Sequence, residues 1–561
     1  MKFLNKVISA AAAVMLAATV SACAQLPRSS EIKIGPNVDA GLASDYLYYS
    51  PVGPSVDAEQ VEILTGFLNA GTGPQNDYAT AREYLSESFK ANWNPSEQVL
   101  IQRVKPEISI YSDTSATATV AVSAEVNSQG QYVTLPTNSS RLLNFSFVRE
   151  RGQWRISSAP NLTLVIKPVF DVIFRSYSLY FFDSQNRFLV PDLRWFPSRA
   201  STGTRLVNAL LAGPSEWLKP AVKNAIPVGT RLATDAVTVL EGIATVNLTS
   251  RALRADVEER QYMKAQITET LSQLGNVYDV ELQIERTPQV IGVLSGLHPQ
   301  SKALSPVAYV DSGLVHLAAS TNTSIIGSRK FLNQVSATDF ALSADEQQLA
   351  MLTPSGVYLA KLGQVGGQAK LLDARPGLLT PVFDAQGYLW SPGATEDQGI
   401  QIVDKAGKLR SFNSGWLATT ERLGFGLSLE GSRAMALIKT EAGTSLYVMA
   451  VLRDSTGAPI GFGQPVQLLG SSGQIISASW IDDVDIAIMS QTASGASAPE
   501  ILTIGGATRT LAAIVGGKQI IAGNAESLIF ALTQDGTMYQ FRGAIWNRVQ
   551  DGVKALHFPG N

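Results

Sequence analysis

The stretch ALLAGPSEWLKPAVKNAIPVGTRL, residues 209–232, decides the fold in the middle of this 561-residue chain. Apolar residues spaced four apart lead up to the pair Gly213-Pro214. Glycine supplies the left-handed conformation just past a helix, and proline prevents the helix from continuing. We therefore predict a helix that stops at this pair, with Ser215 capping a short second helix.

The sequence on both sides of this stretch predicts a sheet. The predicted elements are a strand pair over 176–195 with a polar turn at 183–186, a hairpin over 236–249 about Glu241-Gly242, a helix over 262–277 and a strand over 278–285. Apolar residues alternate in the strands and recur every three or four residues in the helices. Together these elements predict a compact α+β domain over residues 176–290.

A second α+β domain is predicted over residues 57–170. Its first segment, residues 57–70, has the apolar spacing of an amphipathic helix capped near Asp57, and residues 77–93 predict a second helix. Beyond them the apolar period changes to two, and Arg151-Gly152 joins two alternating strands. Helices followed by a curved antiparallel sheet indicate a cone-shaped, NTF2-like domain.

Residues 305–558 show a weak repeat of short strands and turns. An acidic residue marks each unit, and neighbouring markers are 34 to 52 residues apart. The markers are Asp311, Asp345, Asp384, Glu430, Asp482 and Glu526. Units of roughly 40 to 50 residues with several strands each are typical of propeller blades. We predict an all-β propeller of about six blades, with five or seven as alternatives, because a series of β-sandwiches would not explain the repeated pattern.

The start of the chain has the order of a secretory signal. Two lysines precede an apolar run over residues 7–19, which is too short to span a membrane. The sequence VSAC, residues 20–23, resembles a bacterial lipobox and contains the single cysteine of the chain. We predict a lipoprotein signal peptide over residues 1–22, S-diacylglycerol and N-acyl groups on Cys23, and a tether over residues 23–56. The alternative is an incidental cysteine in, or just past, a discarded signal.

The composition argues against several classes of chemistry. The formal charge of −3 becomes −5 once residues 1–22 and their two lysines are removed, so nucleic acid is not an expected partner. The three histidines are widely spaced and form no metal-binding motif. They are His298, His316 and His557. We therefore predict no catalytic residue, no metal site and no cofactor.

Three groups of residues stay open as candidate sites. The acidic run DDVD, residues 482–485, could hold calcium, although it falls where other repeats have a polar turn. Asp192, Arg194 and Trp195 lie near a strand end, where they could anchor an interface or pack against a neighbouring domain. The propeller tryptophans are interpreted as blade-packing residues rather than as platforms for sugars. They are Trp390, Trp416, Trp480 and Trp546.

Residues 209–232, the hairpin segment EGIATVNLT (241–249) and the helix and strand that follow resemble the GerMN domain. With the lipobox and the C-terminal repeats, nearly the whole chain resembles the LpqB family of actinobacterial lipoproteins. The resemblance implies a non-catalytic protein that is lipid-anchored on the extracytoplasmic face of the cell membrane. It also implies a partner, the extracellular domain of the sensor kinase MtrB of the MtrA–MtrB two-component system, whose signalling the protein would modulate. The alternatives are a protein that binds or processes cell-wall glycan, and a purely structural scaffold.

Overall fold

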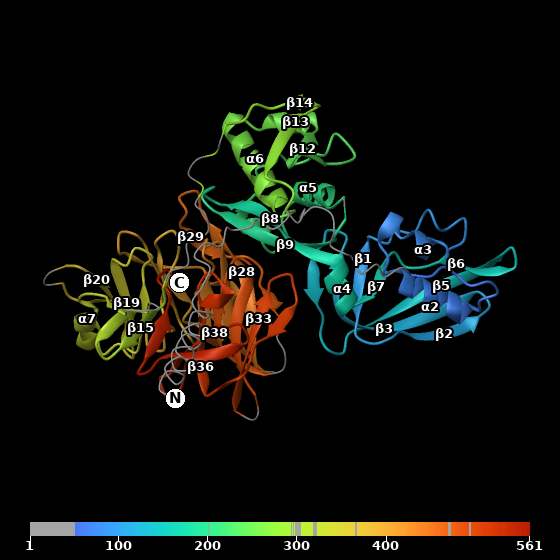
Figure 1. The fold of residues 1–561 in the computed structure, drawn as a ribbon. Helices are drawn as coiled ribbons and strands as arrows, with labels where there is room; N and C mark the ends of the chain where they lie inside the picture. Colours follow the sequence, from blue (N-terminus) through green and yellow to red (C-terminus); the bar gives the residue numbers. More distant parts are fainter. Residues whose placement is uncertain are drawn as a thin grey trace, which may run out of the picture. The chain divides into compact units, whose positions relative to one another are not determined.

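A computed structural model describes residues 51–560, apart from 200, 293, 295, 296, 298–304, 318–321, 365, 366, 442, 469–472, 493 and 494 (Figure 1). These residues form two α+β domains followed by an all-β propeller, which confirms the predicted fold class. The predicted signal peptide, Cys23, most of the predicted tether and His298 lie outside the described residues.

In the N-terminal domain, helix α2 (Gln60–Ala70) packs on a seven-stranded sheet and is followed by η1 (Gln75–Asp77) and α3 (Ala79–Arg82). The sheet has the order β6 (Gln153–Ser158), β5 (Ser140–Glu150), β3 (Ser115–Asn127), β1 (Gln98–Gln102) and β7 (Thr163–Ile166), and β2 (Glu107–Ser112) and β4 (Tyr132–Thr134) also pair with β3. Phe67 on α2 lies edge-on to Phe145 of β5, with ring centroids 6.3 Å apart. Arg151 and Gly152 both have positive φ, at 51° and 79°, as a tight hairpin turn requires.

Two predictions about these helices are wrong. Asp57 does not cap α2, because it has a φ of 58° and exchanges hydrogen bonds with a glutamine of β6. The residue that caps α2 is Glu59, whose N–H donates to the Glu62 carboxylate at 3.1 Å. The second helix has only the four residues of α3. The chain leaves the helix because the Ser86 N–H donates at 2.8 Å to the carbonyl of Ile156 on β6. Pairing with the sheet therefore overrides the local helical spacing; the NTF2-like kind of this domain stays a prediction.

In the middle domain, α5 (Thr202–Ala212) and α6 (Val257–Ser272) share one apolar core with two small sheets. One sheet has the order β10 (Val222–Lys223), β8 (Phe174–Asp183) and β9 (Leu189–Pro197); the other has the order β11 (Thr238–Leu240), β12 (Ile243–Leu248), β13 (Asp279–Ile284) and β14 (Thr287–Pro288). Helix α6 is fastened to β8, because Gln273 accepts the Ser178 N–H at 2.8 Å. Helix α4 (Lys167–Ile173) precedes β8, and η2 (Lys219–Ala221) and η3 (Ser250–Arg254) complete the domain.

The 209–232 stretch ends α5 as predicted, with Gly213 at a φ of 99°. The prediction for Ser215 is wrong, because the segment after it forms only the one-turn 3-10 helix η2 and the Ser215 side chain does not cap it. The Ser215 hydroxyl instead donates to Asp192 Oδ1 on β9 at 2.7 Å. Leaving a buried carboxylate without hydrogen-bond donors costs more free energy than leaving a helical turn uncapped. The Ser215 hydroxyl therefore donates to Asp192 rather than to the following turn.

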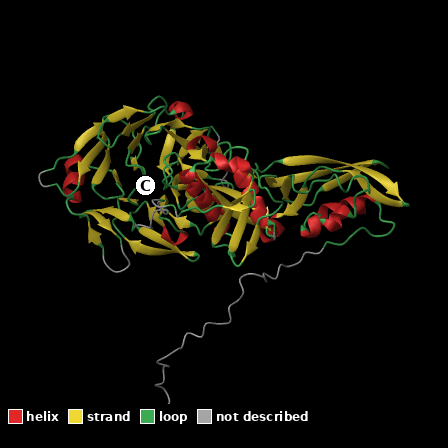
Figure 2. Cartoon of the chain, turned by 90° about the horizontal axis from the view of Figure 1, so that it is seen from above, coloured by secondary structure: helices red, strands yellow, loops and turns green. Residues whose placement is uncertain are grey.

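The C-terminal domain contains six antiparallel sheets set around a common axis, which confirms the prediction of about six blades (Figure 2). The first blade contains β40 (Ala555–His557), β15 (Val307–Val310), β16 (Gly313–His316) and β17 (Thr323–Ser324), and the second contains β18 (Asp339–Leu342), β19 (Gln348–Thr353), β20 (Gly356–Lys361) and β21 (Lys370–Asp373). The third contains β22 (Val382–Phe383), β23 (Leu389–Pro392), β24 (Ile400–Val403) and β25 (Leu409–Ser411), and the fourth contains β26 (Arg422–Leu427), β27 (Arg433–Thr440), β28 (Gly443–Arg453), β29 (Pro459–Phe462) and β30 (Val466–Leu468). The fifth contains β31 (Gln474–Trp480), β32 (Asp485–Gln491), β33 (Ala496–Thr503), β34 (Thr508–Thr510) and β35 (Ile514–Val515), and the sixth contains β36 (Gly517–Ala522), β37 (Ile529–Thr533), β38 (Met538–Arg542) and β39 (Ile545–Gln550). Helix α7 (Ser328–Val335) joins the first two blades.

The last strand of the chain closes the propeller. The first strands of successive blades, β18, β22, β26, β31 and β36, contact one another in turn and form the inner ring. Strand β40 contacts β18 and pairs with β15, so it fills the inner position of the first blade. The C-terminal strand thereby joins the first and last blades, which protects the edges that an open series of sheets would expose.

Candidate functional site

Strand β9 carries a buried ion pair between Asp192 and Arg194. Residues two apart on a strand face the same side. Arg194 Nη2 lies 2.6 Å from Asp192 Oδ2, and the two side chains are only 1% and 6% exposed. Ser215, placed by the turn after α5, donates its N–H to Asp192 Oδ2 at 2.6 Å as well as its hydroxyl to Oδ1. The buried carboxylate is thereby both charge-paired and hydrogen-bonded, which a buried charge requires.

The same strand binds the turn between β3 and β4 of the N-terminal domain. Arg194 donates to the carbonyl of Gln129 at 3.3 Å, and the Trp195 N–H donates to the carbonyl of Gly130 at 2.7 Å. Gly130 has a φ of 80°, and a Cβ there would lie 2.9 Å from the Phe196 ring. Only glycine fits this close approach without strain.

Trp195 contacts all three domains. Its ring centroid lies 5.7 Å from that of Tyr132 on β4 and 5.1 Å from that of Phe170 on α4. Its Nε1 donates at 2.8 Å to the carbonyl of Gly505, in the propeller turn between β33 and β34. Of the two interpretations of Trp195, packing against neighbouring domains is therefore the one that the structure shows.

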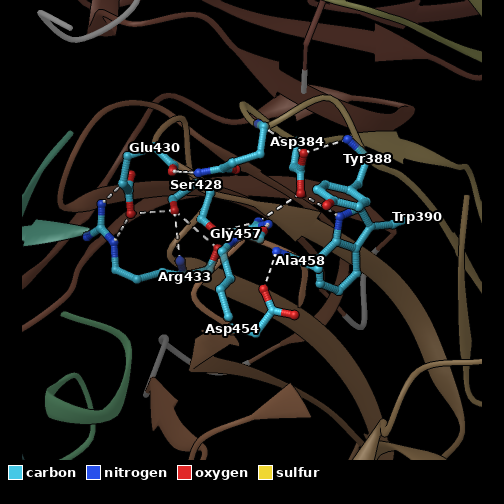
Figure 3. A network of polar contacts seen from close by, with 12 residues as sticks. Asp384, Tyr388, Trp390, Ser428, Glu430, Arg433, Asp454, Gly457 and Ala458 are labelled. Atoms are coloured by element: carbon cyan, nitrogen blue, oxygen red, sulfur yellow. Dashed lines mark hydrogen bonds and ion pairs between the residues drawn. The ribbon is translucent and has the colours of Figure 1, made fainter. Parts of the chain in front are cut away.

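A second buried ion pair, Glu430 and Arg433, lies in the fourth blade (Figure 3). Arg433 Nε is 2.7 Å from Glu430 Oε1, and the guanidinium lies 5.0 Å from the ring centroid of Trp480. Burial alone would raise the pKa of Glu430, but Arg433 holds that pKa below its ordinary value. Arg433 also donates to the carbonyl of Asp483, so this side chain joins the fourth blade to the fifth.

The ion pair of Asp384 and Arg453 extends this network to the third blade (Figure 3). Arg453 Nη2 lies 2.8 Å from Asp384 Oδ2, which also accepts Trp390 Nε1–H at 3.0 Å. Gln386 donates to the carbonyl of Glu430 at 3.1 Å and so links the two ion pairs. Two of the acidic repeat markers therefore hold neighbouring blades together.

The acidic run at 482–485 forms the turn between β31 and β32 beside Arg433. Asp482 accepts the N–H groups of Val484 and Asp485, both at 2.9 Å, as the polar-turn interpretation predicts. In the part of the chain that the structure describes, no group of three or more His, Cys, Asp or Glu is placed to hold a metal ion.

Two carboxyls of this turn have raised pKa values. Burial raises the pKa of Asp483 to about 7; Arg433 opposes the rise, while Glu430 and Asp482 add to it. Burial also raises the pKa of Asp485 to about 6, although a hydrogen bond from a threonine of β33 lowers it. These carboxyls therefore titrate near neutral pH.

The other candidate residues lie apart from one another. His316 Nε2 is 2.9 Å from the Glu346 carboxylate, and His557 Nε2 is 2.7 Å from the Asp339 carboxylate. The four propeller tryptophans lie in three apolar clusters, Trp390 and Trp416 sharing one of them. Their positions agree with the blade-packing interpretation.

A cavity of about 360 Å³ opens where the three domains meet. Its lining residues come from segments as far apart as Gln131 and Thr508, which is why sequence periodicity could not reveal it. Its apolar lining comprises Tyr132, Val133, Pro191, Leu193, Trp217, Val466, Leu468, Val484, Leu502 and Ile504. Strands β4 and β30 contribute to the wall, and within the described chain each of them pairs with a neighbouring strand on one side only.

Comparisons with known proteins match each domain. The family described as "Lipoprotein LpqB, N-terminal domain" matches residues 53–171, "Sporulation and spore germination" matches 178–290, and "Lipoprotein LpqB beta-propeller domain" matches 312–559. The lipoprotein LpqB of Streptomyces avermitilis is 23% identical over 97% of both chains, and that of Thermobifida fusca is 26% identical over 71% of this chain and 68% of its own. A solved structure, the first GerMN domain of the sporulation protein GerM from Bacillus subtilis, is 23% identical over 23% of this chain and 99% of its own, with a TM-score of 0.19.

The fold and these matches define a multidomain lipoprotein with an α+β N-terminal domain, a GerMN domain and a six-bladed propeller. None of the matching family descriptions or relatives' names states a catalytic activity. The chain belongs to the LpqB family. Membership of a lipoprotein family indicates a membrane-anchored envelope protein, and the described residues contain no helix long and apolar enough to cross a bilayer.

Proposed function

We propose that this lipoprotein binds the extracellular domain of a membrane sensor kinase, of the MtrB kind, and modulates its signalling without catalysing a reaction. The observation that carries the proposal is the cavity at the three-domain junction, with its apolar lining and with the edges of β4 and β30, which pair on one side only within the described chain, in its wall. An extended peptide can add to such an edge through main-chain hydrogen bonds while apolar pockets select its side chains.

The junction suits this role because it is pre-organised. Arg194, which is held by Asp192, fastens the middle domain to the N-terminal domain, and Trp195 fastens it to the propeller. A surface that is already ordered loses little conformational entropy when a partner binds. Binding changes the kinase only if the protein has different affinities for the two signalling states, which a rigid surface can provide.

The predicted lipid anchor would keep the junction within reach of a kinase ectodomain. Residue 51 follows Cys23 by 28 residues, which span at most ~100 Å when fully extended. A partner in the same membrane would therefore meet the protein at a raised effective concentration. This geometry supports a partner that itself stands on the membrane.

Photo-crosslinking in intact cells tests the proposal. A photoreactive residue in place of Val133, which lies on β4 and lines the cavity, should crosslink to the kinase. The matched control is Val549 on β39, because it is similarly exposed, at 43% against 50% for Val133, but does not line the cavity. The Cys23→Ala variant should lose the crosslink at equal expression. Equal crosslinking from both positions, or none from Val133, would contradict the proposal.

The cavity gives less support to the alternative function, glycan processing, than to partner binding. Glycosidases use two carboxyls that are free to transfer a proton or attack the sugar. The carboxylates in the cavity lining are those of Asp192 and Glu216. Asp192 is occupied by Arg194 and by both donors of Ser215, so it is a poor acid or base.

A further inference from the structure

A second cavity, of about 290 Å³, lies within the middle domain and does not involve the three-domain junction. The end of β8, the turn after it, the segment that begins at β10, and the start of α6 with the residues before it surround the cavity. The side chains that bear on its chemistry are Asn186, Lys223, Asn224, Arg254, Glu259 and Tyr262. Its volume is near the lower limit for small-molecule sites, which suits a single sugar ring.

Two cations face this cavity without a partner. In the described chain no hydrogen bond or ion pair engages the side chain of Lys223 or Arg254. The one carboxylate among the lining residues, that of Glu259, already accepts the Asp256 N–H at 2.9 Å as part of the cap of α6. An excess of positive charge in a chain of net charge −3 marks a place where an anion is favoured.

An aromatic wall adjoins the cations. Tyr262 lies edge-on to the fully buried Phe182, with ring centroids 5.2 Å apart, and remains partly exposed. Aromatic rings with adjacent polar groups offer both apolar contact and hydrogen bonds to a ligand of mixed polarity. A simple inorganic anion would make no use of this ring.

The polar wall is held in place by buried groups. Asn224 accepts the Ile226 N–H at 3.1 Å and donates to a carbonyl of α5, and the fully buried Gln266 accepts the Ala225 N–H at 2.9 Å. Asn186, in the turn after β8, has a φ of 55°, which asparagine adopts readily in turns, and its N–H donates to the carbonyl of Asp183 at 3.1 Å. The backbone that carries Lys223 is thus held in place beside the cavity.

We propose that this cavity binds a sugar unit that carries an anionic group, with Lys223 and Arg254 contacting the anion and Tyr262 contacting the ring. This inference is independent of kinase binding. The anion could be a carboxylate, as on a muramic acid residue, or a phosphate, as on a phosphorylated sugar. Both share the chemistry that two unpaired cations recognise.

Titration of the full-length protein in detergent with three sugars tests the site. N-Acetylmuramic acid and N-acetylglucosamine 6-phosphate represent the two sources of the anion, and neutral N-acetylglucosamine is the matched control ligand. We expect at least one acidic sugar to bind at millimolar or lower concentration, about tenfold more tightly than the neutral sugar, and the tighter acid identifies the source. Inorganic phosphate should bind more weakly than the tighter of the two acidic sugars, because it cannot contact Tyr262.

Variants of the two cations assign the binding to this cavity. Lys223→Gln and Arg254→Gln should each weaken binding of the acidic sugar about tenfold. Arg231→Gln removes an exposed cation of the same domain that does not line the cavity, and it should leave binding unchanged. Both cavity cations are exposed, so the variants should keep the wild-type unfolding temperature. The proposal is overturned if no acidic sugar binds at 10 mM (about ten times the expected limit), or if neutral sugar or phosphate binds as tightly. It is also overturned if a variant that combines Lys223→Gln with Arg254→Gln binds the acidic sugar as tightly as the wild type.

Discussion

Replacing Asp483 with asparagine should stabilise the turn between β31 and β32 at pH 8 and reduce its pH dependence. Burial raises the pKa of this carboxyl from 3.8 to about 7, so the folded protein keeps a proton that the unfolded chain has released. Stability therefore falls as the pH rises between these two values and is constant above about pH 7. At about 1.36 kcal/mol per pH unit the full effect is about 4 kcal/mol. Because the side chain retains partial exposure, we expect a gain of about 2 kcal/mol at pH 8.

Hydrogen exchange of residues 474–491, measured from pH 5 to pH 8 and corrected for intrinsic exchange, reports this local stability. The free energy of opening in the wild type should decrease from pH 5 to about pH 7, whereas Asp483→Asn should leave only the smaller decrease below about pH 6 that Asp485 contributes. The matched control is Asp482→Asn, which removes the neighbouring charge and keeps the oxygen that accepts the turn's N–H groups. A wild-type opening free energy that stays constant, or an Asp483→Asn variant that is less stable at pH 8, would refute the assignment of a buried, protonated carboxyl.

Three further changes probe the junction, the propeller and the anchor. Trp195→Ala removes two ring contacts and the hydrogen bond to Gly505, so the free energy of domain docking should weaken by about 3 kcal/mol. Limited proteolysis should therefore cleave this variant faster than the control variant Trp195→Phe. Arg433→Met leaves the Glu430 carboxylate buried without its cation and should cost about 3–5 kcal/mol in denaturant unfolding of the propeller, with at least partial recovery on adding Glu430→Gln. Cys23→Ala should move the protein from the membrane fraction to the soluble fraction on cell fractionation, and retention in the membrane would contradict lipid anchoring.

Signals carried by neighbouring residues predicted the fold well. The Gly213 stop, the Arg151-Gly152 turn and the number of blades follow from backbone preferences and apolar spacing within short windows. The errors at residues 57 and 77–93 arise where a distant strand supplies a hydrogen-bond partner that competes with the local helix. Neighbouring residues cannot reveal such competition, because the competing group lies some 70 to 100 residues away.

The candidate sites were harder to predict for the same reason. The sequence singled out Asp192, Arg194 and Trp195, but not Ser215 as the donor to the carboxylate, nor the propeller turn that accepts the indole N–H. The spacing of Asp192 and Arg194, two residues apart on a strand, was the available signal that these side chains share a face. Which surface that face meets depends on how separate domains dock, and local patterns carry no information on docking.

The acidic repeat markers show how one position can serve two purposes. In the second blade, Asp345 accepts a serine hydroxyl and a backbone N–H and acts only within its own turn. Asp384 and Glu430 occupy comparable turns but are buried in ion pairs. For Glu430 the cation is Arg433, three residues on, so the pairing could be anticipated from the sequence; for Asp384 it is Arg453, 69 residues away on the next blade. Burying a carboxylate without its cation is costly. Because Asp384 and Arg453 lie on different blades, their ion pair can form only once the third and fourth blades have docked. The ion pair should therefore favour the correct register of these two blades over a shifted one.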